Sequence, residues 1–181
     1  MPLSAICLDR DGTIIEEKHY LKDPDLVVLE QNVVPALQKI QAAGLPIFII
    51  TNQSGIGRGL ISVDEYNAVH ARLIELLSAE GIQITATYYC PDHPENATPM
   101  RKPEPGMLHA AASDYGFDVH DAVMIGDKPA DVACGQAAGA KSVWVQTGYG
   151  ASSEPPNPPA DYVAKDCLDA VEHFILPLLE S

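Results

Sequence analysis

Short apolar runs and amphipathic segments alternate along almost the whole of this 181-residue chain. The runs have the length and the β-branched composition of buried strands, whereas the segments between them place apolar residues three or four positions apart, as helices do. Parallel strands need a long crossover between them, and a helix is the usual crossover. The alternation therefore predicts an α/β fold, a Rossmann-like parallel sheet with helices on both faces.

The limits of the expected elements follow from capping residues and glycine stops. Strands are expected at 5–8, 46–50, 84–89, 122–125 and 142–145, with an edge strand at 162–163. Helices are expected from Val33 to a stop at Gly44, from the capping box of Ser62 and Glu65 to Gly81, from Pro105 to Gly116, from Pro129 to Ala138 and after Asp166. The proline-rich residues 151–160 are expected to form an exposed loop within a single domain of residues 1–181.

The composition is that of an ordinary globular protein, with 46% hydrophobic and 20% charged residues. No apolar stretch reaches about 18 residues and no basic segment precedes an apolar one at the N-terminus, so we expect a cytoplasmic protein without a membrane partner. Cys7, Cys90, Cys134 and Cys167 lack a framework spacing and are expected to be reduced. The net charge of −14 disfavours nucleic acid as a partner, so any anionic substrate must be small and met by a local cluster of cations. We also expect the protein to be a monomer.

Two carboxylates, Asp9 and Asp11, follow the first apolar run two positions apart. In an extended segment they would lie on the same side, where they would repel each other unless a divalent cation lay between them. Gly12 allows the backbone to turn sharply at this point. A polar strand end with a tight turn is the alternative interpretation of this pattern.

Polar residues follow four of the expected strands. They are Asp9 and Asp11 after the first, Thr51 and Asn52 after the second, Arg101 and Lys102 after the third, and Asp127 and Lys128 after the fourth. A parallel sheet brings these ends to one edge. There Asp9, Asp127 and a backbone carbonyl would give Mg²⁺ three oxygen ligands, while Lys102 and the Thr51 hydroxyl would donate to phosphate oxygens. Such a group suits phosphoryl transfer.

Four motifs occur in order along the chain, namely Asp9-x-Asp11-Gly12-Thr13, Thr51-Asn52, Lys102 and Gly126-Asp127-x3-Asp131. Together they resemble those of the haloacid dehalogenase superfamily of phosphatases, in its capless form, because about 50 residues between Thr51 and Lys102 leave no room for a cap domain. Within the superfamily, Thr51-Asn-Gln-Ser-Gly-Ile-Gly-Arg-Gly and Arg101-Lys-Pro-Glu-Pro-Gly-Met107 are similar to segments of the D-glycero-D-manno-heptose 1,7-bisphosphate 7-phosphatases and of the histidinol-phosphate phosphatases.

The resemblance implies a role for each motif residue. Asp9 would be the nucleophile that forms an aspartyl-phosphate, and Asp11 would act as the acid and then the base. Mg²⁺ would be held by Asp9, Asp127 and the carbonyl of Asp11, while Lys102 steadies the nucleophile and the phosphoryl group. Asp131 is expected to orient Lys102 or a metal-bound water.

Loops select the substrate in capless members of the superfamily. The matching residues here are Glu17, Lys18, His19, Tyr20, Thr51, Asn52, Gln53, Ser54, Arg101 and Lys128. Arg101 would hold a second phosphate, for which a guanidinium is well shaped.

Two segments depart from the pattern of the heptose enzymes. Their first loop usually reads Asp-x-Gly-Tyr, whereas this chain has Glu17-Lys18-His19-Tyr20. They typically carry a zinc loop with three cysteines and a histidine, and the four corresponding positions here are Cys90, Asp92, Thr98 and Met100. Because threonine and methionine are poor zinc ligands, we expect no zinc.

The resemblance implies a Mg²⁺-dependent hydrolase of carbohydrate metabolism that removes the 7-phosphate of a heptose bisphosphate for lipopolysaccharide biosynthesis. Hydrolysis of histidinol phosphate is an alternative, since the same motifs serve both reactions. A non-catalytic phosphosugar-binding module is a third possibility, although such a module has no use for both a nucleophile and a second acid.

Overall fold

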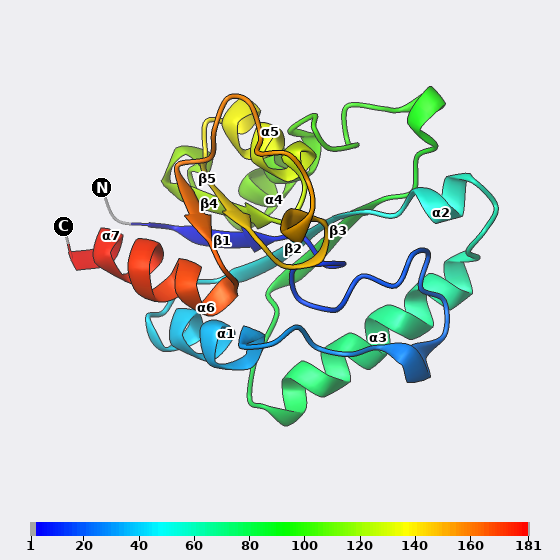
Figure 1. Ribbon diagram of the computed structural model, residues 1–181, viewed down its shortest axis with the longest axis horizontal. Helices are drawn as coiled ribbons and strands as arrows, with labels where there is room; N and C mark the ends of the chain where they lie inside the picture. Colours follow the sequence, from blue (N-terminus) through cyan, green and yellow to red (C-terminus); the bar gives the residue numbers. More distant parts are fainter. Residues whose placement is uncertain (1–2, 181) are drawn as a thin grey trace.

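The computed structural model describes residues 3–180 and contains a six-stranded, wholly parallel sheet with the strand order β3-β2-β1-β4-β5-β6 (Figure 1). The strands are β1 (Ala5–Leu8), β2 (Ile47–Asn52), β3 (Ala86–Cys90), β4 (Ala122–Gly126), β5 (Lys141–Val145) and β6 (Tyr162–Ala164). This confirms the expected α/β class. The polar residues Thr51 and Asn52 belong to β2, because they continue its ladder with β3.

The helices are α1 (Val33–Ala42), α2 (Ser54–Gly57), α3 (Val63–Ala79), α4 (Gly106–Tyr115), α5 (Pro129–Ala138), α6 (Cys167–Ala170) and α7 (Leu176–Glu180), with a π-helical segment, η5 (Val171–Ile175), joining the last two. Helices α1, α3, α4 and α5 lie where the sequence predicts them, whereas the short α2 was not expected. Residues 3–180 also contain four 3₁₀ turns: η1 (Pro24–Leu26), η2 (Pro94–Asn96), η3 (Val119–Asp121) and η4 (Gly148–Ala151). The Ser62–Glu65 capping box precedes α3 with both of its hydrogen bonds formed.

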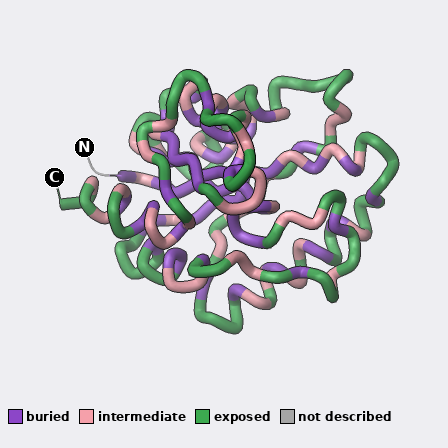
Figure 2. Tube along the Cα trace, in the orientation of Figure 1, coloured by how far each residue is buried: buried purple, intermediate pink, exposed green. Residues whose placement is uncertain are grey.

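Helices cover both faces of the sheet because its central strands are apolar on both sides. Ile6 and Leu8 of β1 pack toward α1, α3 and α6, whereas Ala5 and Cys7 pack toward α4 and α5. The trace in Figure 2 is buried along β1, β4 and nearly all of β2. Each fully buried aliphatic side chain of this kind stabilises the fold by about 1.5–3 kcal/mol.

The strand order reverses direction between β1 and β4. The chain passes from β1 outward to β2 and β3, and then returns to the other side of β1 to form β4. At such a point the loops after the two strands diverge and leave a crevice at their C-terminal ends. The segments that begin with Asp9 and Asp127 border this crevice.

Three expected features differ in the structure. The third strand begins at Ala86, after Ile84, and the last helix is divided by η5. The loop 151–160 is mostly exposed, but it begins within η4 and its Pro156 is buried. Among residues 3–180, no helix has the length and the apolar character that a membrane crossing requires.

Candidate active site

Three buried carboxylates meet at the C-terminal edge of β1 and β4. Asp9 follows β1, Asp127 follows β4, and Asp131 lies in the first turn of α5. One carboxylate oxygen from each residue lies within 4.8 Å of those of the other two. The pairing of β1 with β4 extends to the backbone of Asp9, whose N–H donates to the Ile125 carbonyl at 2.9 Å. A group of oxygen ligands of this kind suits a hard divalent cation.

Lys102 neutralises two of these carboxylates from within the core. Its ammonium lies 2.9 Å from Oδ1 of Asp9 and 2.7 Å from Oδ1 of Asp131, and donates to the Ile50 carbonyl at 2.7 Å. Burial is the largest single influence on the pKa of Asp9 and would raise it, but the charges of Lys102 and Lys128, together with hydrogen bonds from Lys102 and from the Arg10 backbone, lower it below its usual range. Burial would likewise lower the pKa of Lys102, yet the two carboxylates raise it above its usual range. Asp9 is therefore held as a carboxylate.

Asp127 has one carboxylate oxygen engaged and one without a partner. Oδ2 accepts a hydrogen bond from the backbone N–H of Tyr149 at 2.8 Å, whereas the buried Oδ1 has no hydrogen-bond partner. Burial, followed by the charges of Asp9 and Asp131, raises the pKa of Asp127 to about 8. An unpaired buried oxygen among carboxylates is costly, and a bound cation would remove that cost. The residues present therefore fit a Mg²⁺ ion.

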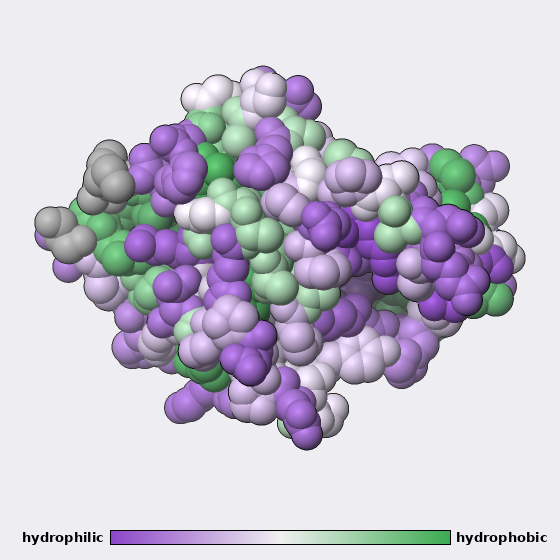
Figure 3. All heavy atoms as spheres, turned by 90° about the horizontal axis from the view of Figure 1, so that it is seen from above, coloured by the Kyte–Doolittle hydropathy of each residue, from purple (hydrophilic) through white to green (hydrophobic). Residues whose placement is uncertain are grey.

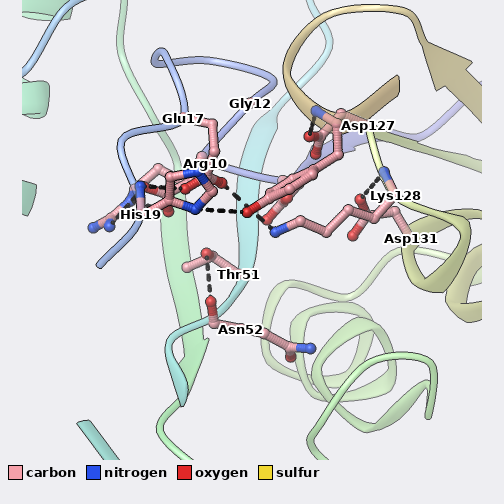
Figure 4. A network of polar contacts seen from close by, with 12 residues as sticks. Arg10, Gly12, Glu17, His19, Thr51, Asn52, Asp127, Lys128 and Asp131 are labelled. Atoms are coloured by element: carbon pink, nitrogen blue, oxygen red, sulfur yellow. Dashed lines mark hydrogen bonds and ion pairs between the residues drawn. The ribbon is translucent and has the colours of Figure 1, made fainter. Parts of the chain in front are cut away.

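The second carboxylate of the first motif, Asp11, is held by hydrogen bonds from two neighbouring side chains, Arg10 and Gln53. The buried guanidinium of Arg10 donates to it through Nε at 2.9 Å and Nη2 at 3.2 Å, and Gln53 donates at 2.9 Å. Arg10 also lies over the ring of Tyr66, with its Cζ 5.4 Å from the ring centroid. In Figure 4, Arg10, Glu17 and His19 lie opposite Asp127, Lys128 and Asp131.

Two adjoining cavities open beside these carboxylates, on a hollowed and largely hydrophilic face of the molecule (Figure 3). The smaller, of about 170 Å³, is lined by Asp9, Arg101, Lys102, Ala130 and Asp131. The larger, of about 220 Å³, is lined by Glu17, His19, Tyr20, Leu21, Gln53, Gly55, Ile61 and Tyr149. Asp11, Asn52, Ser54 and Lys128 line both cavities. The site can thus hold a charged group next to Asp9 and a polar body beside it.

Known proteins share this sequence and this fold. A family model described as HAD-hydrolase-like matches residues 99–170. The D-glycero-D-manno-heptose-1,7-bisphosphate 7-phosphatase of Thermosynechococcus vestitus is 38% identical, with 95% of each chain covered. The D-glycero-beta-D-manno-heptose-1,7-bisphosphate 7-phosphatase of Mesorhizobium japonicum is also 38% identical, with 82% of this chain and 72% of the relative covered. The chain belongs to this family of haloacid dehalogenase phosphatases.

A solved structure agrees with membership of the heptose bisphosphate phosphatase family. The crystal structure of D,D-heptose 1,7-bisphosphate phosphatase from B. bronchiseptica, complexed with magnesium and phosphate, matches with a TM-score of 0.87 at 29% identity. The match covers 97% of this chain and 99% of that one. Haloacid dehalogenase phosphatases use Mg²⁺, and the acidic cluster described above offers oxygen ligands for it.

Most of the substrate-binding residues expected from the sequence border the two cavities, but two do not. The buried Thr51 hydroxyl accepts a hydrogen bond from Gln53 at 2.9 Å, and the Lys18 ammonium lies 3.7 Å from Glu16. Asn52 lines both cavities while its side-chain amide exchanges two hydrogen bonds of 3.0 Å with the backbone of Lys102. Asn52 therefore fixes the Lys102 segment to the end of β2.

Two polar residues that hold the site together, Arg10 and Tyr149, are among those that sequence reasoning missed. Arg10 stands between the two aspartates of the first motif, and nothing in the sequence indicates that its side chain is buried and paired with Asp11. Tyr149 lies in η4, which matches none of the four motifs, and it reaches the site because η4 follows β5 and folds against Asp127. Both contacts depend on tertiary structure.

The segment that corresponds to the zinc loop of the heptose enzymes is held by hydrogen bonds. Oδ2 of Asp92 accepts from the backbone N–H of Thr98 at 2.7 Å and from its hydroxyl at 2.6 Å. The Asp92 carbonyl accepts from the guanidinium of Arg101 at 3.2 Å. Asp92 and Thr98, two of the four positions that the resemblance relates to a zinc loop, are therefore bonded directly to each other.

Proposed function

We propose that this phosphatase removes the 7-phosphate of a D-glycero-D-manno-heptose 1,7-bisphosphate, in a Mg²⁺-dependent reaction that supplies heptose for lipopolysaccharide or another surface glycan. The observation that carries the proposal is the pair of Asp9 and Lys102, 2.9 Å apart at the wall of the smaller cavity. It provides an ionised nucleophile beside a cation that can contact the transferring phosphoryl group. The names of the relatives supply the substrate class.

In this mechanism the carboxylate of Asp9 attacks phosphorus through the oxygen that Lys102 does not bind. The bond between phosphorus and the C7 oxygen of the sugar breaks, and Asp11 gives its proton to that oxygen. Asp11, now a carboxylate, then takes a proton from water, whose oxygen attacks the phosphoaspartate. Inorganic phosphate leaves and Asp9 is restored. Arg10 and Gln53 hold Asp11 at the wall shared by the two cavities, and the Arg10 guanidinium pairs with the carboxylate that Asp11 becomes once it has given up its proton.

Asp9, Asp127 and the backbone carbonyl of Asp11 would hold Mg²⁺, which neutralises negative charge between the carboxylates and the phosphoryl group when it is bound. Asp131 instead positions other groups. One of its oxygens lies 2.7 Å from Nζ of Lys102 and the other accepts from the backbone N–H of Lys128 at 3.0 Å. With both oxygens engaged, Asp131 supports Lys102 better than it would serve as a metal ligand.

Arg101 favours a bisphosphate over histidinol phosphate, which has a single phosphate. Arg101 lines the same cavity as Asp9 and is anchored through one guanidinium N–H to the Asp92 carbonyl. Its remaining N–H groups are available to a second phosphate in the bidentate geometry that guanidinium groups favour. Lys128 lines both cavities and adds a further positive charge.

The decisive experiment compares kcat/KM for the heptose 1,7-bisphosphate, histidinol phosphate and p-nitrophenyl phosphate in the presence of Mg²⁺. We expect the bisphosphate to be preferred by at least about tenfold, which corresponds to one charge-assisted contact. Arg101→Ala should remove most of that preference, whereas Arg72→Ala, a change to an exposed arginine paired with Glu75, should leave it intact. A preference for histidinol phosphate would contradict the proposed substrate.

A further inference from the structure

One loop contributes much of the lining of the larger cavity, and we call this loop, residues 16–21, the strap. Within it His19 and Tyr20 have φ angles of 49° and 53°. This left-handed region is unfavourable for side chains other than glycine, asparagine and aspartate. Among residues 3–180, Asn32 is the only other non-glycine residue with a positive φ. Two adjacent residues held in this state need compensating contacts.

The strap is attached to a different segment on each side of the cavity. Nδ1 of His19 shares a hydrogen bond of 2.8 Å with the Tyr149 hydroxyl, and the two rings meet edge to face with centroids 5.8 Å apart. Tyr20 lies against Gly55 of α2, where an added Cβ would come within 2.8 Å of its ring. The left-handed turn thus directs consecutive side chains to η4 and to α2.

The attachment to η4 also reaches the catalytic carboxylates. Tyr149 donates its backbone N–H to Asp127, and Lys128 places its ammonium 4.9 Å from the centroid of the Tyr149 ring. The same ammonium lies 3.8 Å from Glu17 of the strap (Figure 4). The strap, η4 and the end of β4 therefore form a closed ring of contacts around the larger cavity.

We propose that His19 and Tyr149 are positioning residues whose hydrogen bond closes the strap over the sugar portion of the substrate and so favours large phosphate esters over small ones. The inference rests on the proposed function. A transferring phosphoryl group needs the smaller cavity, with Asp9 and Lys102, whereas the body of a heptose needs the wall that the strap builds. Without a cap domain, this two-loop closure is the structural means of enclosing that body.

Two variants remove the hydrogen bond while sparing the backbone. His19→Gly loses the imidazole but accepts the positive φ, and Tyr149→Phe keeps the ring beside Lys128 and the N–H bonded to Asp127. For the heptose bisphosphate we expect each variant to raise KM about fivefold to tenfold with kcat changed less than about twofold, as for the loss of one hydrogen bond. The rise in KM for p-nitrophenyl phosphate should be several times smaller than the rise for the heptose bisphosphate.

Coupling and rescue separate positioning from general stabilisation. The double variant should resemble either single variant, because both remove the same bond. His19→Asn should recover part of the affinity, since asparagine tolerates the left-handed region and offers an amide. Tyr115→Phe, at an exposed tyrosine bonded only weakly to the Thr85 carbonyl at 3.5 Å, serves as the control and should match the wild type.

Each result has a defined consequence. Equal losses for both substrates, or additive losses in the double variant, would overturn the role of the His19–Tyr149 pair even if the wild type prefers the bisphosphate. A wild type that lacks this preference would overturn the proposed function itself, and the proposed role of the strap with it. The two failures are distinguished by the wild-type measurement alone.

Discussion

At the scale of single residues, the site is a group of charges that does not balance by itself. Three carboxylates, from Asp9, Asp127 and Asp131, face the ammonium groups of Lys102 and Lys128. A phosphate ester adds up to two further negative charges. Since Lys102 already contacts Asp9 and Asp131, the unpaired oxygen of Asp127 is the atom at which a divalent cation would neutralise the most charge.

Asp9→Asn should abolish turnover while the protein remains folded. An amide has nearly the shape of a carboxylate but is a poor nucleophile, and Lys102 keeps its ion pair with Asp131. Steady-state assays should show background rates, and intact-mass spectrometry after rapid quench should show no phosphoenzyme. Substantial hydrolysis by this variant, with wild-type melting behaviour, would exclude the covalent mechanism.

Lys102→Met should destabilise the protein as well as inactivate it. It leaves Asp9 and Asp131 buried without their ammonium partner, a change that costs about 3–5 kcal/mol in other proteins. The matched control is Lys39→Met, because Lys39 lies 3.3 Å from Glu172 in an exposed pair worth at most about 1 kcal/mol. Urea unfolding measures both variants. Similar free energies of unfolding for the two variants would show that the buried ion pairs stabilise the protein no more than the exposed pair does.

At the scale of elements, the sequence predicted where most helices and strands lie because the signals are local. Gly139 ends α5 in a left-handed conformation, and Ser62 caps α3, as their patterns indicated. The order of the strands is not local, since it depends on which crossovers return across β1. The short α2 was missed for a related reason: four residues carry too little periodicity to be detected.

The candidate site likewise has a part that could be predicted from the sequence and a part that depends on tertiary structure. Asp9, Lys102 and Asp127 could be grouped from the sequence because parallel strands bring their C-terminal ends to one edge. The contacts of Arg10 with Asp11 and of Tyr149 with His19 could not, because they depend on side-chain packing across loops of irregular conformation. The sequence thus located the catalytic residues and much of the cavity lining, whereas the contacts that hold Asp11 and His19 in place could be found only in the folded structure.

Gly12→Ala tests how the turn after β1 supports the site. Gly12 has a φ of 85°, and a Cβ there would overlap the carboxylate of Asp127. Gly44→Ala is the control, since Gly44 has a similar φ of 78° with nothing within 4 Å of an added Cβ. We expect Gly44→Ala to cost about 1 kcal/mol of stability and little activity, and Gly12→Ala to cost more stability and at least about tenfold in kcat/KM. Equal behaviour of the two variants would show that the overlap is relieved without consequence.

At the scale of the whole molecule, a strongly acidic protein gathers cations at one edge of its sheet. The chain has 25 acidic and 11 basic residues, yet Arg101, Lys102 and Lys128 all line the smaller cavity. An acidic surface repels long polyanions, while a local cluster of cations still attracts a small phosphate ester. The charge distribution of the whole chain therefore favours a small anionic substrate.

Two parts of the molecule lead to expectations about metal ions: the carboxylate cluster for Mg²⁺, and the segment of Asp92 and Thr98 for zinc. EDTA should inactivate the enzyme and Mg²⁺ should restore it, because carboxylates and phosphate otherwise crowd one pocket. Zinc should be absent, since Asp92 and Thr98, at two of the four positions that the resemblance relates to a zinc loop, are bonded to each other. Full activity in metal-free buffer would contradict the first expectation.

Elemental analysis and three variants test the second expectation, that zinc is absent. After dialysis the protein should contain far less than one zinc per chain, and Cys90→Ser should leave its metal content unchanged, because the Cys90 thiol is buried and burial raises its pKa. Thr98→Val should loosen the segment, since it removes the hydroxyl that donates to Asp92, while Thr98→Ser keeps that donor. Because the Asp92 carbonyl anchors Arg101, the valine variant should raise KM for the bisphosphate more than the serine variant does. Zinc at one ion per chain that disappears in Cys90→Ser would show instead that a metal ion organises the segment.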